Sequence, residues 1–264
     1  MERKLIYINS DNRKMKVIML SPTNNKLNPG ILWIHGGGYY EGMASMIYFS
    51  KGCSIAKRFN AVVLSPEYRK SKQEPYPAAF NDCVSTLKYM YNNAEKLGID
   101  KNKIIIGGES AGGGLAIALS LYARDNNIPI MLQIPLYPMI DCFDTPSSKN
   151  NHGYNWNTKK NHKAWKLYLG KLYYEKDIPK YASPSREKDY SNLPPCYTFV
   201  QDNEPFYCET LKYIRDLRKF NVDANIDIYH GKMHAFDILF WTKKSKIAKK
   251  RMFKNIEKYF ILED

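Results

Sequence analysis

The run IIIGGESAGG at residues 104–113 joins an apolar segment to a helix-compatible one near the middle of the chain. Ile104–Gly107 is short and continuously apolar, which predicts a buried strand, and Leu115–Tyr122 suits a helix. Between them, residues 108–112 read Gly-x-Ser-x-Gly. In this context the pattern predicts a sharp, strained turn, with glycines where side chains would clash. The turn lifts the Ser110 hydroxyl out of the sheet to a helix N-terminus, which favours a developing negative charge. The run therefore predicts a nucleophilic serine.

A second glycine-rich turn precedes this one in the chain. His35-Gly36-Gly37-Gly38 directly follows the apolar run Ile31–Ile34. Consecutive glycines leave backbone N–H groups accessible, which an oxyanion hole requires. With the serine turn downstream, we expect the amides of Gly37, Gly38 and Ala111 to be its donors. The alternatives are a plain glycine turn or a phosphate-binding loop, but no Lys-Ser/Thr follows, as the phosphate loop requires.

A nucleophilic serine needs a base, and the base needs an acid that orients it, here in the chain order serine, acid, histidine. Two carboxylates, Asp202 and Glu204, follow one predicted strand, and His230 and His234 follow the next. His230 is still at the strand end, whereas His234 lies in the loop and is free to reach Ser110. We therefore expect His234 to be the base. Both Asp202 and Glu204 are candidates for the acid, because each stands just past a strand end.

Short apolar runs alternate with longer periodic stretches along most of the chain. Several runs are continuous rather than alternating, as in a parallel sheet covered by helices on both faces. Apolar residues recur at helical spacing from Phe80 to Tyr91 and from Leu211 to Phe220. The alternation predicts an α/β fold, with a mostly parallel sheet flanked by helices, in a single domain spanning residues 1–264. The predicted strands are Met15–Leu20, Ile31–Ile34, Ala61–Ser65, Ile104–Gly107, Met131–Ile134, Tyr197–Val200 and Asn225–Tyr229.

The segment 141–192 interrupts this rhythm. It has no convincing strand but contains several aromatic residues, among them Trp156 and Trp165. A stretch this long without sheet elements is more typical of a functional insertion than of a plain loop. We expect a small, partly helical lid over the carboxyl edge of the sheet, where ligands bind in such folds.

Composition excludes several classes of protein. The chain has 264 residues, 14% of them aromatic, which argues against a disordered protein. No apolar run approaches the roughly 20 residues that cross a bilayer, and residues 1–10 do not resemble a signal peptide. The five cysteines are scattered and never spaced as Cys-x-x-Cys, which favours reduced thiols over a disulfide framework or a zinc site. We therefore expect a cytoplasmic protein without a membrane span.

The formal net charge is +14, which raises the question of an anionic partner such as nucleic acid. Much of the excess lies between Lys243 and Lys258, where Ile247, Phe253 and Ile256 interleave with lysines at near-helical spacing. This pattern favours an amphipathic terminal helix with a solvated basic face. We therefore do not expect a nucleic-acid partner.

Taken together, the motifs resemble the hormone-sensitive-lipase-like branch of the α/β-hydrolase fold, the group of acetyl esterases and carboxylesterases. The resemblance covers roughly Ile31 to Phe236. It implies the α/β-hydrolase fold, a small-molecule ester as substrate, short acyl groups such as acetyl, and no metal or organic cofactor. The matching motifs are His35-Gly36-Gly37-Gly38, Glu67-Tyr68-Arg69, Pro77-Ala78-Ala79, Gly98-Ile99-Asp100, Gly108–Gly113, Ala182-Ser183-Pro184, Leu193-Pro194-Pro195 and Met233-His234-Ala235-Phe236.

Two departures from that branch affect the expected site. The usual Asp-Pro stands here as Glu204-Pro205, which implies a Ser-His-Glu triad of Ser110, His234 and Glu204, with Asp202 as the alternative acid. The long N-terminal cap helices of the family have no counterpart before the glycine turn. The lid is then formed by 141–192 alone, and we expect a more open pocket.

Three other functions compete with ester hydrolysis. The same machinery suits an amidase or peptidase, for example of an arylformamidase-like kind, since the leaving group is chosen by the lid. A non-catalytic homologue that binds small molecules is a second alternative, although such a protein is expected to lose the histidine that His234 supplies. A nucleic-acid module rests on charge alone. Exposed tyrosines and phenylalanines also leave a homodimer open.

Overall fold

The computed structural model describes residues 1–260 and contains one eight-stranded sheet, in the order β1-β2-β4-β3-β5-β6-β7-β8. β1 and β2 form an antiparallel hairpin, β2 also pairs with β4 in the antiparallel sense, and all other pairs are parallel. The predicted α/β fold with a mostly parallel sheet is confirmed. The strands are β1 (Glu2–Ser10), β2 (Arg13–Ser21), β3 (Asn28–Ile34), β4 (Val62–Pro66), β5 (Ile99–Glu109), β6 (Leu132–Leu136), β7 (Cys196–Gln201) and β8 (Ala224–Tyr229).

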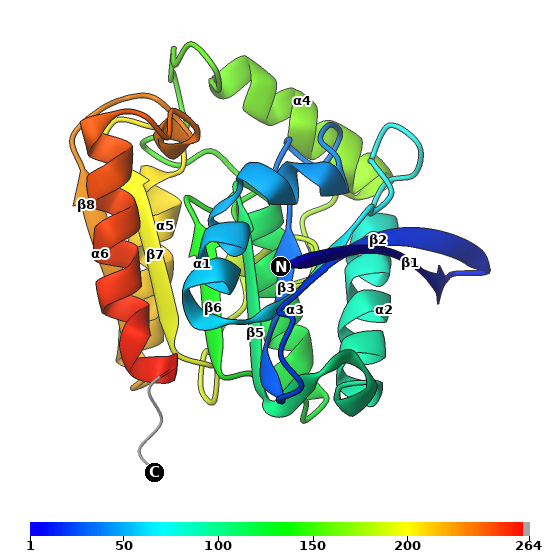
Figure 1. Ribbon diagram of the computed structural model, residues 1–264. Helices are drawn as coiled ribbons and strands as arrows, with labels where there is room; N and C mark the ends of the chain where they lie inside the picture. The colour runs from blue at the N-terminus through cyan, green and yellow to red at the C-terminus, as the bar shows by residue number, and fades with distance from the viewer. Residues whose placement is uncertain (261–264) are drawn as a thin grey trace.

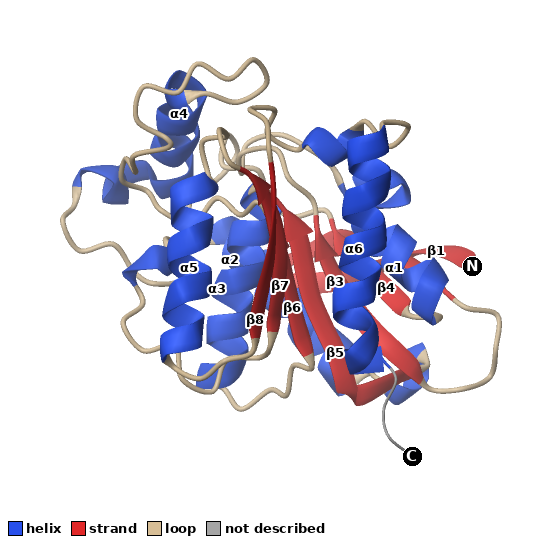
Figure 2. Cartoon of the chain, turned by 90° about the vertical axis from the view of Figure 1, so that its left-hand side faces the viewer, coloured by secondary structure: helices blue, strands red, loops and turns tan. Residues whose placement is uncertain are grey.

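Helices cover both faces of the sheet (Figure 2). α1 and α6 pack on one face, and α2, α3 and α5 pack on the other. The central strands between these layers are largely apolar: Ile31, Leu32, Trp33 and Ile34 of β3 are all fully buried. Burial on both faces explains why the strand runs are continuous in the sequence. The helices are α1 (Lys51–Phe59), α2 (Ala78–Asn92), α3 (Ala111–Asp125), α4 (Thr158–Leu169), α5 (Tyr207–Lys219) and α6 (Lys243–Phe260).

The segment 141–192 places its helix α4 over one end of the sheet (Figure 1). It contains α4 and two short 3₁₀ helices, Gly170–Tyr174 and Pro184–Arg186, and the structure, which describes all of this segment, assigns no strand to it. Asn157 directly precedes α4, and its side chain accepts a hydrogen bond from the Lys160 amide at 3.0 Å and so caps the helix. The segment is therefore partly helical. Its residues Asn155 and Trp156 lie at the edge where the parallel strands end, whereas Asp189 and Ser191 contact Arg124 near the C-terminal end of α3.

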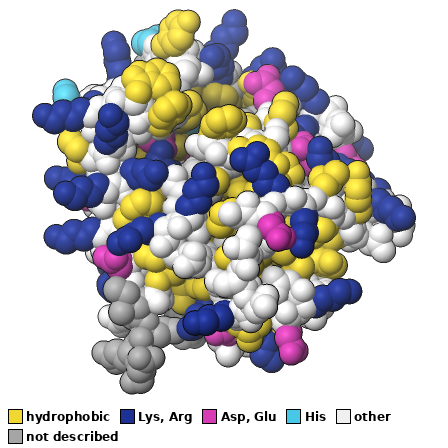
Figure 3. Space-filling view, viewed as in Figure 1, with side chains coloured by type: hydrophobic (Ala, Val, Ile, Leu, Met, Phe, Trp, Pro, Cys, Tyr) yellow, Lys and Arg dark blue, Asp and Glu magenta, His cyan; other side chains and the backbone are white. Residues whose placement is uncertain are grey.

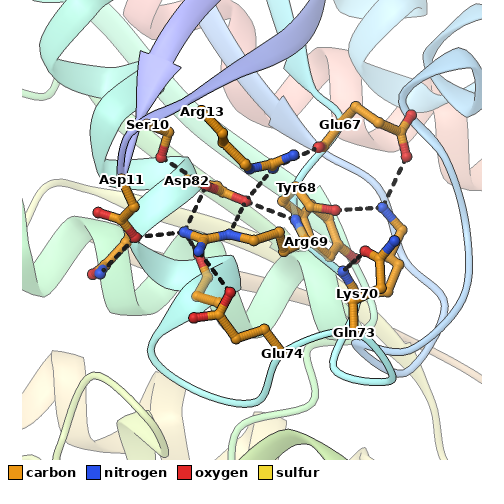
Figure 4. A network of polar contacts seen from close by, with 12 residues as sticks. Ser10, Asp11, Arg13, Glu67, Tyr68, Arg69, Lys70, Gln73, Glu74 and Asp82 are labelled. Carbon is orange, nitrogen blue, oxygen red and sulfur yellow. Dashed lines mark hydrogen bonds and ion pairs between the residues drawn. The ribbon is translucent and has the colours of Figure 1, made fainter.

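Asp82 of α2 fastens the N-terminal hairpin to the rest of the fold (Figure 4). Its buried carboxylate accepts hydrogen bonds from Ser10 Oγ at 2.6 Å and Arg13 Nη2 at 2.7 Å. It also accepts from the backbone amide and the guanidinium of Arg69, at 2.7 and 2.9–3.1 Å. A buried charge is tolerated when it is satisfied in this way. The Glu67-Tyr68-Arg69 motif thus joins the hairpin, α2 and the loop after β4.

Within residues 1–260, none of the helices combines the length and the apolar character needed to cross a membrane.

Candidate active site

Ser110 stands on the turn between β5 and α3 in a strained backbone conformation. Its φ is 56° and its ψ is −120°, a combination that non-glycine residues rarely adopt. The turn is tight: a Cβ on Gly108 would lie 2.4 Å from the Gly112 carbonyl oxygen, and one on Gly112 would lie 2.1 Å from the Ile34 oxygen. The glycines on both sides are therefore required by space, and the serine is held at the carboxyl end of the central strand.

His234 meets Ser110 from the loop after β8. The His234 Nε2 and Ser110 Oγ atoms are 2.8 Å apart, and both side chains are buried. That distance is right for proton transfer between a hydroxyl and a base. Three aromatic rings surround the imidazole edge-on or tilted, with centroids 4.8 Å (Phe206), 5.1 Å (Tyr137) and 6.2 Å (Trp156) away. They hold the imidazole in one orientation.

Glu204 lies on the far side of His234 from the serine. Its Oε2 is 3.4 Å from His234 Nδ1, and the carboxylate is fully buried. The pair is within ion-pair distance, but neither atom has a partner of good hydrogen-bond geometry among the described residues. Burial raises the pKa of Glu204, and the attraction of His234 lowers that pKa in part.

Asp202, the alternative acid, has a different partner. It lies 2.9 Å from Nδ1 of His230 at the surface, and it accepts the Gly231 amide at 2.9 Å. These two contacts hold the pKa of Asp202 below its usual range. The structure thus brings Ser110, His234 and Glu204 into one row and leaves Asp202 outside it.

The glycine turn after β3 borders the same site. Gly37 and Gly38 both have positive φ, 119° and 57°, and both line the cavity next to Ser110. A Cβ on Gly37 would lie 2.3 Å from the Glu41 carbonyl oxygen. Ala111, the third expected donor, is the first residue of α3, where backbone N–H groups have no partner within the helix. Gly37 and Gly38 therefore border the same cavity as Ser110, and Ala111 directly follows the serine.

His35 supports the glycine turn. Its ring stacks on Tyr68 with centroids 4.2 Å apart, and its Nδ1 is 2.8 Å from the Gly36 carbonyl oxygen. The Tyr68 hydroxyl donates to the His35 carbonyl oxygen at 3.0 Å. Burial and the positive charge of Lys70 lower the pKa of His35 to about 4, so the ring is neutral at physiological pH. It acts as a packed support for the turn.

A cavity of about 550 Å³ opens directly above Ser110 and His234. Its walls are mainly apolar and include residues from the region before α1, the turn after β6, the insertion 141–192 and the loop before α6. The insertion contributes Asn155 and Trp156. The other apolar and aromatic lining residues are Met46, Phe49, Tyr137, Ala235, Ile238, Phe240 and Trp241.

One side of the cavity carries a charged group of three residues that the sequence analysis missed. Lys51 Nζ lies 2.6 Å from Asp237 Oδ2, and both side chains are buried. The Lys51 amide donates to Glu109 Oε1 at 3.2 Å. Burial and the nearby charge of Asp237 raise the pKa of Glu109 to about 7. Lys51 therefore links Glu109, the residue before Ser110, to the loop that carries His234.

Only one of these three had a signal in the sequence. Glu109 is the variable position directly before Ser110 in the Gly-x-Ser-x-Gly motif, so its side chain had to lie near the site. Lys51 and Asp237 are 186 positions apart and belong to no motif. Among the described residues, no group of three or more His, Cys, Asp or Glu is placed to hold a metal ion.

Comparisons with known proteins agree with the fold described above. Residues 31–238 match a protein family described as alpha/beta hydrolase fold. An AB hydrolase superfamily protein of Schizosaccharomyces pombe is 29% identical over 229 residues, which make up 78% of this chain and 62% of that protein. An arylesterase of Saccharolobus solfataricus is 28% identical over 246 residues, 89% of this chain and 77% of that protein. A solved structure named bacterial heroin esterase has a TM-score of 0.93 and 29% identity, covering 99% of this chain and 85% of that one.

Proposed function

The chain belongs to the alpha/beta hydrolase fold family as an esterase-type member, and we propose that it hydrolyses short-chain carboxylic esters with Ser110, His234 and Glu204 as its triad. The observation that supports this most directly is the 2.8 Å contact between Ser110 Oγ and His234 Nε2 at the base of an apolar cavity. A serine is a weak nucleophile until an adjacent base takes its proton. This contact supplies that base.

In the proposed reaction, Ser110 Oγ attacks the acyl carbon while its proton passes to His234 Nε2. The negative charge that develops on the carbonyl oxygen is held by the amides of Gly37, Gly38 and Ala111. Loss of one donor of this kind typically costs about 3–4 kcal/mol of transition-state stabilisation. His234 then protonates the leaving alcohol, which departs and leaves an acyl-serine. Water, deprotonated by His234, attacks the acyl-serine, and the proton returns to Ser110 as the acid is released.

Glu204 takes the role of the acid in this proposal. It lies 3.4 Å from His234 Nδ1, on the opposite side of the imidazole from Ser110, and it is excluded from water. A carboxylate in that place fixes the tautomer of the histidine and stabilises the imidazolium that forms during the reaction. Asp202 is engaged with His230 and Gly231 instead.

We assign the role of a lid to segment 141–192. Its Asn155 side chain donates a hydrogen bond to the His234 carbonyl oxygen, and its Trp156 ring lies beside both His234 and Gly38. A shift of this segment would change the width of the cavity and the support of the histidine together. Such a segment selects substrates by the size of the group that it admits.

For the substrate we propose an ester with a small acyl group, such as acetate, and an apolar or aromatic alcohol. The cavity is lined mainly by aromatic and aliphatic side chains, which suits an apolar leaving group. The relative from Saccharolobus solfataricus is named an arylesterase, in keeping with that preference.

The test is the hydrolysis of p-nitrophenyl esters from acetate to octanoate by the wild type and by Ser110→Ala. We expect the fastest turnover on the shorter esters and its loss in Ser110→Ala. Ser120→Ala, which removes another buried serine hydroxyl in α3, is the matched control and should remain active. Absence of serine-dependent turnover on every ester would contradict the proposal. Serine-dependent cleavage of anilides or formamides in its place would favour the amidase alternative.

A further inference from the structure

The rim of the cavity carries large apolar side chains that point into solvent. We call Phe49, Ile238, Phe240 and Trp241 the mouth patch. Their exposed fractions are 87%, 61%, 66% and 59%, although all four also line the cavity. Phe240 and Trp241 stand edge to face, with ring centroids 5.1 Å apart. Contiguous exposed apolar residues around a cavity mark a surface that meets an apolar partner.

Lysines surround one side of this patch. Between His230 and Lys250 the chain has six lysines, all exposed, and a single acid. That acid, Asp237, is buried and paired with Lys51, so it does not offset the lysines at the surface. Figure 3 shows hydrophobic side chains at the upper left, where the loop between β8 and α6 lies, and lysine and arginine side chains below them along α6. The lysines are Lys232, Lys243, Lys244, Lys246, Lys249 and Lys250.

The position of these lysines is unfavourable for the helix itself. Lys243, Lys244 and Lys246 occupy the start of α6, whose first turn has no acidic residue. The N-terminus of a helix carries a partial positive charge, so cations there reduce helix stability. The arrangement becomes favourable when an anionic surface faces it.

We propose that the mouth patch docks the protein on an anionic phospholipid bilayer. Phe240, Trp241, Phe49 and Ile238 enter the boundary between headgroups and acyl chains, and the lysines at the start of α6 contact the phosphates. Aromatic side chains and lysines are the residues that proteins place at this boundary. Anionic lipids attract basic segments that lie against the membrane.

Charge favours a bilayer over a second copy of the chain. Two copies joined through their mouth patches would bring their lysines together, in a protein whose formal net charge is already +14. Docking would also turn the cavity toward the membrane, so that, resting on the proposed function, ester substrates dissolved in the bilayer would reach Ser110 directly. The docking itself does not depend on hydrolysis.

The experiment is sedimentation with vesicles of phosphatidylcholine alone and of an equimolar mixture with phosphatidylglycerol. Ser110→Ala is used beside the wild type, so that binding is measured without turnover and stands whether or not the esterase proposal holds. We expect at least about tenfold stronger binding to the anionic vesicles, weakening steeply as salt is raised.

Paired variants locate the surface. Phe240→Ser/Trp241→Ser should lower binding at least about tenfold, because the apolar anchors are lost. Tyr7→Ser/Leu27→Ser removes side chains that are 60% and 59% exposed on other parts of the fold and should bind like the wild type. Lys243→Gln/Lys246→Gln should weaken binding to the anionic vesicles and reduce its salt dependence. Lys96→Gln/Lys101→Gln, with the same charge change near the start of β5, should change neither.

Three results would overturn the proposal. One is binding that is equal for neutral and anionic vesicles, or absent for both. A second is binding that Phe240→Ser/Trp241→Ser leaves unchanged while the protein remains folded by circular dichroism. The third is a dimer in solution that this double variant dissociates, since the patch would then be an interface between copies of the chain.

Discussion

Two histidine–carboxylate pairs lie on the same two loops, one after β7 and one after β8, and they differ in almost everything else. In the outer pair, His230 and Asp202 are 2.9 Å apart, and the His230 side chain is 90% exposed. In the inner pair, His234 and Glu204 are 3.4 Å apart, and the His234 side chain is 6% exposed. The outer pair has the shorter contact, but only the inner histidine reaches Ser110. Depth, and not contact length, separates a pair suited to catalysis from a surface contact.

The surroundings of the two carboxylates shift their pKa values in opposite directions. Hydrogen bonding to Gly231 and to His230 lowers the pKa of Asp202, which sits in water and stays ionised. Burial raises the pKa of Glu204, so its charge is costly unless His234 is close. Water screens the outer pair strongly, whereas the inner pair interacts through a medium of low dielectric constant. A strong interaction between acid and base is therefore expected only for the inner pair, His234 and Glu204.

The largest difference between the two pairs is predicted for the histidines. His234→Gln should lower kcat on p-nitrophenyl acetate by at least about 10⁴-fold, because the serine loses its base. His230→Gln, the same change on the exposed pair, should stay within about twofold of the wild type. Circular dichroism would show that both variants are folded. Comparable losses in both variants would mean that the two pairs do not differ in the way their burial indicates.

The buried ion pair of Lys51 and Asp237 should contribute to the stability of the fold. Asp237 lies three residues beyond His234 in the chain. The side chains of Lys51 and Asp237 are buried, as are those of His234 and Glu204. Lys51→Met should lower the free energy of unfolding by about 3–5 kcal/mol, because Asp237 is left as an uncompensated buried charge. Replacing both partners, as Lys51→Met/Asp237→Leu, should restore much of that loss. Urea unfolding measures both, and a double variant no more stable than the single one would contradict this explanation.

Glu109 should make the stability of the folded protein depend on pH. Its pKa in the folded protein is about 7, raised from 4.5, so the folded state holds this proton more tightly than the unfolded state. Its contribution to stability is fully present below pH 4.5 and is lost as the pH rises through about 7. Glu109→Gln removes this titration. The melting temperature of the variant, relative to the wild type, should therefore be higher at pH 8 than at pH 5, and a constant difference across that range would exclude the effect.

The smallest effect is predicted for Asp202. Asp202→Asn should change the free energy of unfolding by about 1 kcal/mol or less at neutral pH, because its pair with His230 is exposed and screened. The pKa of Asp202 is lowered in the folded protein, so this small contribution should disappear as the pH falls through and below the ordinary range of an aspartate. A loss of several kcal/mol would show that the outer pair is a structural element in its own right.

Much of the fold could be predicted from local pattern. Each of the seven predicted strands corresponds to a strand of the sheet. For the central parallel strands this follows because burial on both faces needs continuous apolar runs. The first strand, Glu2–Ser10, was not predicted. It lies at the sheet edge with most of its residues exposed, so its charged residues hide the pattern. In α6, Met252 is buried and Ile247 is exposed, although both are apolar, because the neighbouring elements decide which face is covered.

The part of the site that the sequence did not predict depends on contacts between distant segments. The Gly-x-Ser-x-Gly turn and the glycine turn carry their geometry in adjacent residues, so the sequence alone indicates them. Asp202 and Glu204 are two positions apart with similar chemistry, and only the path of the chain after β7 decides which of them turns inward. Lys51 and Asp237 meet across 186 positions, a contact that no local pattern encodes.

The most direct test of the difference between the two pairs is kcat and KM on p-nitrophenyl acetate for Glu204→Gln and Asp202→Asn, measured side by side. The glutamine keeps the shape of the buried side chain but cannot stabilise the imidazolium, so kcat should fall by about 10³–10⁴-fold with little change in KM. Asp202→Asn should retain activity within about twofold of the wild type. The reverse result, an active Glu204→Gln beside an inactive Asp202→Asn, would contradict the assignment of the buried carboxylate as the acid of the triad.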